Sequence, residues 1–120
     1  MNQIFVIVAG LYGALGVSFA AIAAHGGAAT TLGSAAQMLL FHAPALLALG
    51  LYGRAAGHSG LILQAGGLVI LVGCALFAGD LAVRHWRGSG LFPMAAPSGG
   101  TLMILGWFLI LVAGLLLARD

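Results

Sequence analysis

Residues 61–83 read LILQAGGLVILVGCALFAGDLAV, an apolar run with Gln64 near one end and Asp80 near the other. A helix rises about 1.5 Å per residue, so a run of this length can cross the hydrocarbon core of a bilayer. Three further stretches contain no Asp, Glu, Lys or Arg: residues 4–24, 34–52 and 101–118. Because backbone groups in lipid must be hydrogen-bonded internally, these runs predict helices. We therefore expect an all-α integral membrane protein with four transmembrane helices.

The composition supports this class. Of the 120 residues, 62% are hydrophobic and only 5% are charged, whereas about a quarter of the residues in a soluble domain are charged. The chain contains 20 glycines, which suit closely packed membrane helices. This excludes a disordered chain, nucleic-acid binding and a soluble catalytic fold. The expected surroundings are the lipid bilayer.

The connections between the predicted helices are short, at residues 25–33, 53–60 and 84–100. Short links place consecutive helices beside one another in opposite directions. We therefore expect an antiparallel four-helix bundle that forms a single transmembrane domain over residues 1–120. An alternative for the first run is a cleaved signal peptide, against which no Lys or Arg precedes Phe5.

The orientation in the membrane depends on four arginines. Arg54 and Arg119 fall on one side of the predicted membrane and Arg84 and Arg87 on the other, so the positive-inside count is tied. Asp80 precedes Arg84 by four residues, a spacing at which a helix pairs the two side chains. The pairing partly offsets the positive charge of Arg84. The side with Arg54 and Arg119, which also holds both termini, is therefore the more positive one and is expected in the cytoplasm.

Small residues recur along the predicted helices. They are Gly16, Ala20 and Ala24, with Ala9 and Gly13, in the first, Ala75 and Gly79 in the third, and Gly106 and Gly114 in the fourth. Such residues let helix backbones approach closely. Packing within the bundle is the favoured interpretation, and association with a second chain is the alternative.

Polar residues gather at one predicted end of the bundle, where the first and third helices end and the second and fourth begin. This polar cluster comprises His25, Gln37, His42, Asp80, Arg84 and Ser98. Ionisable residues within membrane spans are candidate functional sites. For Asp80 the simpler alternative is an ion pair with Arg84. For His42 it is a hydrogen bond to a backbone carbonyl, to Gln37 or to Asp80.

Two local features accompany the cluster. Pro44 cannot donate a hydrogen bond to the carbonyl of Leu40 and should bend or loosen the second helix there. In the loop LFPMAAPSGG, residues 91–100, Ser98 can cap the fourth helix. Free N–H groups at that helix start could then receive a carboxylate or phosphate. The favoured alternative is a helix start whose turn packs back on the bundle.

Four motifs stand out in the sequence: GALGVSFAAIAAHG at residues 13–26, FHAPALLALG at 41–50, LFAGDL at 76–81, and PSGG at 97–100 followed by Gly106 and Trp107. In this order they resemble the motifs of one family, domain of unknown function 423. The family often has a glutamine three residues before the histidine of the second motif, where this chain has Leu39. The resemblance implies a small bacterial membrane protein, which places the chain in the inner membrane. It implies no biochemical activity.

Several functions remain open. The leading hypothesis is a non-enzymatic membrane protein that acts through oligomerisation or as an accessory subunit of a membrane-protein partner. The alternative is a binder of a lipid, quinone or small anion at the polar cluster. A proton or ion pathway through His42 and Asp80 is weaker, and a haem held by His25 and His42 weaker still. The sequence contains no metal-ligand spacing, nucleophile–base pair or phosphate-binding motif, so we expect neither catalysis nor a metal or other cofactor.

Overall fold

The computed structural model describes residues 2–26, 30–52 and 57–119. These residues form four α-helices and no strand: α1 (Asn2–His25), α2 (Thr30–Tyr52), α3 (Gly57–Arg87) and α4 (Ala95–Leu117). Each helix is long and apolar enough to cross a membrane. The expected all-α fold with four membrane-length helices is therefore confirmed. Arg54 and Asp120, which contribute to the charge count, lie outside the described residues.

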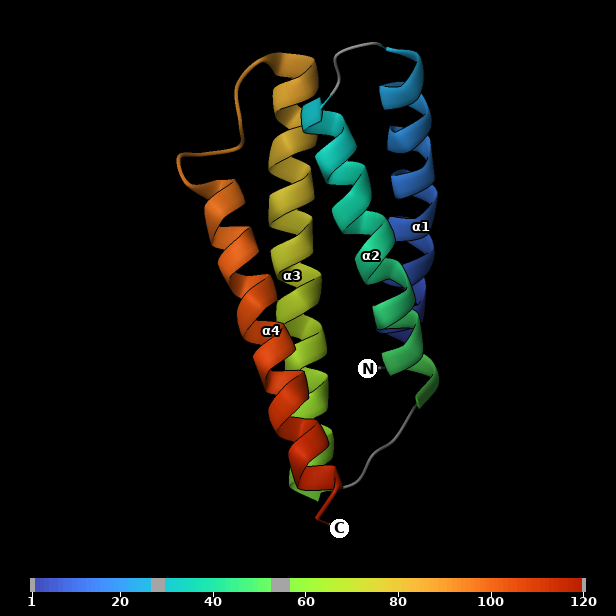
Figure 1. Ribbon diagram of the computed structural model, residues 1–120, viewed down its shortest axis with the longest axis vertical. Helices are drawn as coiled ribbons and strands as arrows, with labels where there is room; N and C mark the ends of the chain where they lie inside the picture. The colour runs from blue at the N-terminus through green and yellow to red at the C-terminus, as the bar shows by residue number, and fades with distance from the viewer. Residues whose placement is uncertain (1, 27–29, 53–56, 120) are drawn as a thin grey trace.

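The helices form two pairs, α1 with α2 and α3 with α4, which contact each other through α2 and α3. Figure 1 shows α1 and α3 running in one direction and α2 and α4 in the other. The closely packed pairs are α1 with α2, α3 with α4, and α2 with α3. The ends of α1 and α3 and the starts of α2 and α4 therefore lie toward one end of the molecule, at the top of Figure 1.

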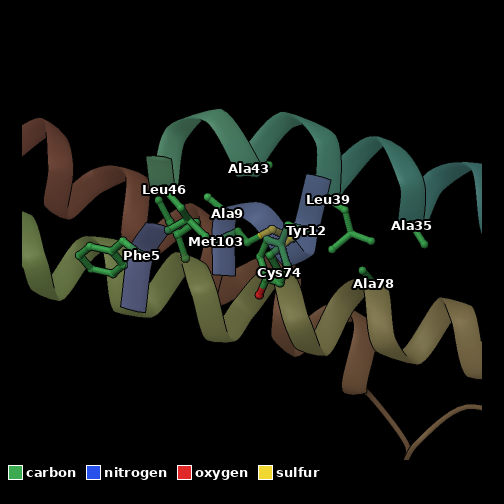
Figure 2. Close-up of a cluster of buried hydrophobic side chains, with 11 residues drawn as sticks. Phe5, Ala9, Tyr12, Ala35, Leu39, Ala43, Leu46, Cys74, Ala78 and Met103 are labelled. Atoms are coloured by element: carbon green, nitrogen blue, oxygen red, sulfur yellow. The ribbon is translucent and has the colours of Figure 1, made fainter. Parts of the chain in front are cut away.

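The core lies between the two pairs and draws side chains from all four helices. Figure 2 shows its main members: Phe5, Ala9 and Tyr12 from α1, Ala35, Leu39, Ala43 and Leu46 from α2, Cys74 and Ala78 from α3, and Met103 from α4. The Tyr12 hydroxyl donates a hydrogen bond to the backbone carbonyl of Leu71. This bond satisfies a buried polar group and ties α1 to α3.

Glycines bring the backbones of α3 and α4 into contact. A Cβ added to Gly73 would lie 2.7 Å from the carbonyl oxygen of Gly99, and one added to Gly66 would lie 2.9 Å from that of Gly106. From the first contact to the second, the residue number falls from 73 to 66 in α3 and rises from 99 to 106 in α4. The two helices are therefore antiparallel. Gly16 of α1 similarly faces the side chain of Leu40 in α2. At these positions, the small residues serve packing within the chain.

The ends of α3 and α4 differ from the predicted spans. α3 continues to Arg87, and Gly88 follows it with a φ of 77°, where its N–H bonds to the carbonyl of Arg84. This is the left-handed conformation in which glycine commonly ends a helix. α4 begins at Ala95, about one and a half turns before the expected start of its span at Thr101.

The prediction that Ser98 caps α4 is wrong. The capping position belongs to Met94, which has a φ of 69° and no capping side-chain hydrogen bond. Ser98 lies within the first turn and its N–H donates to the carbonyl of Met94. Pro97 does not prevent this earlier start, because a proline in the first helical turn sacrifices no intrahelical hydrogen bond.

Candidate functional site

Asp80 is the most buried ionisable residue at the predicted polar end, with none of its surface exposed. The Nε of Arg84 donates to its Oδ2 over 3.1 Å, which makes the ion pair that the four-residue spacing predicts. The backbone N–H of Leu91 donates to Oδ1 over 2.7 Å. Both carboxylate oxygens are therefore occupied by protein donors.

This carboxylate also lies at the start of α4. The backbone N–H of Ala96, in the first helical turn, lies near enough to stabilise its negative charge. An anion is stabilised at a helix N-terminus, where N–H groups have no helical partner. Asp80 thus supplies from α3 the cap that α4 lacks in its own sequence.

Gly90 permits this arrangement. A Cβ at that position would collide with Oδ1 of Asp80 and with the guanidinium of Arg84. Only a residue without a side chain lets the connection between α3 and α4 fold over the carboxylate. The contacts of Asp80 join the end of α3, the connection and the first turn of α4 into one unit.

His42 lies deeper, in the middle of α2, and is 7% exposed. The indole Nε1 of Trp107 lies 3.2 Å from its Nε2. An indole N–H can only donate, so Nε2 is the acceptor and carries no proton. The proton of the neutral ring is then on Nδ1, which donates to the carbonyl of Met38 over 2.7 Å. Both ring nitrogens are satisfied, and the histidine links α2 to α4.

The backbone explains why these two residues meet. His42 and Trp107 each follow the start of their helix by twelve residues, about 18 Å along the axis. Both starts lie toward the same end of the molecule (Figure 1). The two side chains therefore reach similar depth although 65 positions separate them in the sequence. Trp107 is 45% exposed within a membrane-length helix, and an indole N–H at that depth needs an acceptor in the protein. This need is the sequence signal that could have suggested the pairing.

In the part of the chain that the structure describes, the remaining members of the polar cluster form no hydrogen bond with Asp80 or His42. His25 is exposed at the end of α1, where its Nδ1 contacts the carbonyl of Ala21 over 2.8 Å. Gln37 and Ser98 are also exposed. Among the described residues, no hydrogen bond connects any of these three side chains to Asp80 or His42. Of the six predicted residues, the structure brings together only Asp80 and Arg84.

Two apolar grooves open on the sides of the helix pairs. One, of about 240 Å³, lies between α1 and α3 and is lined by Leu11, Tyr12, Leu15, Phe19, Leu39, Ala75, Ala78, Gly79 and Ala82. The other has a volume of about 350 Å³ and lies between α2 and α4. It is lined by Trp107 together with Ala45, Ala48, Leu49, Tyr52, Leu63, Ile110 and Leu117. Within the described ranges, no group of three or more His, Cys, Asp or Glu side chains could hold a metal ion.

These features define a small helical membrane protein whose polar contacts tie its helices together. A family model described as protein of unknown function (DUF423) matches residues 19–100, more than half of the chain. The chain belongs to this family. The match contains the second and third motifs noted above, PSGG at 97–100 and the end of the first motif. No curated protein and no solved structure matches the chain.

Proposed function

We propose that this is a non-enzymatic protein of the bacterial inner membrane that acts by associating, through the outer face of α1, with a second copy of itself. The observation that carries the proposal is the open space around two glycines of α1. A Cβ added to Gly10 or to Gly13 would meet nothing within 4 Å. Packing within this chain therefore does not account for glycine at either position.

The surrounding surface has the same character. Small side chains lie along the outer side of the helix, interrupted by the exposed Val17. We term them the α1 small-residue face: Gly10, Gly13, Ala14, Ala21 and Ala24. Small residues are enriched where membrane helices meet, because they let two backbones approach within van der Waals contact. A glycine in an exposed helix interior otherwise costs about 0.5–1 kcal/mol relative to alanine.

The outer face of α4 provides the contrast. Its exposed side chains are bulky, among them Ile104, Phe108 and Leu111. Such side chains keep a neighbouring helix at a distance and suit contact with acyl chains. Bulky side chains are exposed on α1 as well, among them Ile7 and Leu11, and Gly114 of α4 is also open. The difference is that α1 places two open glycines and three exposed alanines on one side of the helix, which makes α1 the better candidate for a helix–helix interface.

The binding and proton-pathway hypotheses gain less support. Asp80 engages both carboxylate oxygens with protein donors, and His42 engages both ring nitrogens. Each hydrogen-bonding atom of these two side chains already has a protein partner, so neither side chain is an unsatisfied group that calls for a ligand or a relay. For this reason we place function at the outer surface of the bundle.

The test measures association in vesicles by energy transfer between labelled copies, over a range of protein-to-lipid ratios. Gly10→Leu and Gly13→Leu should each associate about tenfold or more weakly than the wild type, because each adds bulk where two backbones meet. Gly114→Leu is the matched control, since its Cβ would also meet nothing within 4 Å but lies on α4. A wild type that stays monomeric at every ratio would contradict self-association, as would association insensitive to both α1 variants. In either case the role of an accessory subunit would need a different partner surface.

A further inference from the structure

The groove between α1 and α3 arises because these helices are not a closely packed pair and because α3 presents small residues there. Leu11, Leu15 and Phe19 of α1 form one wall. Across from them, α3 contributes only small lining residues: Ala75, Ala78, Gly79 and Ala82. A Cβ on Gly79 would touch nothing nearer than the side chain of Leu91, at 3.7 Å. The space is therefore left open by residue size.

The groove runs along the helices toward the end of α3. Residues 75, 79, 82 and 86 follow one another at the three- and four-residue steps that place them on one helix face. The lined part spans about 10 Å along α3. Just beyond it stands Trp86, which is 58% exposed and meets the ring of Phe19 edge-on at 5.6 Å. A tryptophan at such a position marks the interface between hydrocarbon and headgroups.

Two arginines and a histidine flank this tryptophan in the sequence. Arg84, His85 and Arg87 are all exposed at the end of α3. Arg84 is paired with Asp80, which offsets its charge. In the described part of this end, Arg87 is the arginine without an ion-pair partner. The groove thus leads from an apolar channel to a positively charged end.

We propose that the groove holds one acyl chain of a phospholipid whose anionic headgroup lies against Arg87 and its neighbours at the end of α3. The walls are almost wholly apolar and open sideways, toward the hydrocarbon that surrounds a membrane-length helix. Positive side chains at headgroup depth attract anionic lipids, at about 1 kcal/mol per charge.

The size of the groove argues against the alternative occupant, a helix of a second copy. The groove holds about 240 Å³ along about 10 Å of α3, so it is narrow. A helix with its side chains is about 10 Å across and does not enter a groove of this size. A single extended chain is the better fit. This site also lies away from the α1 small-residue face, so it stands independently of the proposed self-association.

The test is a lipid titration of the delipidated full-length protein in detergent, followed by native mass spectrometry. The probes are dioleoyl phosphatidylglycerol, which is anionic, and dioleoyl phosphatidylcholine, which has the same chains and no net charge. We expect one phosphatidylglycerol per chain to bind several-fold more tightly than phosphatidylcholine. Arg87→Ala should weaken phosphatidylglycerol binding about fivefold and leave phosphatidylcholine binding unchanged, because it removes one headgroup charge.

Two variants test the groove itself. Gly79→Leu and Ala75→Leu both fill it and should each weaken phosphatidylglycerol binding about tenfold or more. Ala48→Leu is the matched control, because it makes the same change in the groove between α2 and α4. Helical content and elution volume show whether each variant is folded, and the second groove variant keeps the test decisive should one of them fail to fold.

Three results would overturn the proposal. The first is equal binding of the two lipids, or binding of several equivalents without saturation at one. The second is wild-type affinity in both groove-filling variants. The third is a lipid-free dimer that Gly79→Leu dissociates, which would place a second copy in the groove. Gly10→Leu should leave phosphatidylglycerol binding unchanged, so failure here is distinguishable from failure of the association proposal.

Discussion

The α3–α4 pair uses four glycines inside the molecule, at positions 66, 73, 99 and 106, whereas α1 leaves Gly10 and Gly13 outside. Gly73 and Gly99 are each so close to the opposing backbone that a methyl group would not fit, while Gly10 and Gly13 face open space. The amino-acid composition does not distinguish the packed glycines from the open ones. The comparison shows that the same residue type has a packing role between α3 and α4 and no such role within the chain at positions 10 and 13 of α1.

The strongest test of this comparison is the smallest possible substitution at Gly99. A Cβ there would meet the carbonyl oxygen of Gly73 at 2.5 Å and the backbone nitrogen of Phe77 at 2.6 Å. Neither backbone atom can move without separating α3 from α4, so Gly99→Ala should lower the free energy of unfolding by about 3 kcal/mol. Unfolding in mixed micelles of increasing SDS content measures the change. Gly114→Ala, at an open position, should cost nothing, and equal stabilities of the two variants would refute the interpretation.

A second prediction concerns the polar contact at the end of the α3–α4 pair. Asp80→Ala leaves the N–H of Leu91 without its acceptor and removes the anion at the start of α4. Arg84, whose side chain is 46% exposed, can return to water, so we expect a loss of about 2 kcal/mol. Hydrogen exchange should rise at Leu91 and Ala96 and stay unchanged in α1. Asp80→Asn keeps an acceptor oxygen and should lose less; protection at Leu91 that survives Asp80→Ala would show that the carboxylate does not hold the connection.

A third prediction concerns the contact between the two helix pairs. Trp107→Phe removes the donor to Nε2 of His42 but keeps an aromatic side chain at that depth. The loss should be about 1 kcal/mol, typical of one hydrogen bond. A double-mutant cycle with His42→Phe isolates the interaction, and it should give a coupling free energy of about 0.5–1.5 kcal/mol. Additive single effects would mean that the two residues contribute to stability separately.

The sequence predicted the helices and the Asp80–Arg84 pair because both depend on local spacing. Uninterrupted apolar runs of membrane length permit little besides helices, and a four-residue interval places two side chains on one face. The His42–Trp107 contact depends instead on how α2 and α4 are rotated about their axes. These helices are apolar around their whole circumference, so no amphipathic pattern indicates which residues face inward.

The start of α4 shows a different limit. Rules for helix caps search for a serine, threonine, aspartate or asparagine beside the first turn, and Ser98 satisfied that search. The negative charge beside this helix start is that of Asp80, which comes from the preceding helix and accepts a hydrogen bond from Leu91 in the connection. Caps supplied across helices leave no local pattern, which is why the prediction placed the helix start too late.

The smallest expected effect is at the α1 glycines, and it completes the comparison. Gly10→Ala and Gly13→Ala add a methyl group where nothing lies within 4 Å. Alanine also favours a helix more than glycine does. In dilute micelles, where copies are separated, each variant should therefore unfold with a free energy equal to that of the wild type or up to about 0.5–1 kcal/mol higher. The same variants in vesicles at high protein-to-lipid ratio should lose any such gain, because the methyl group then stands between associated helices. A loss of stability in dilute micelles comparable to that of Gly99→Ala would mean that the outer face of α1 packs within the single chain, and the contrast between the two regions would disappear.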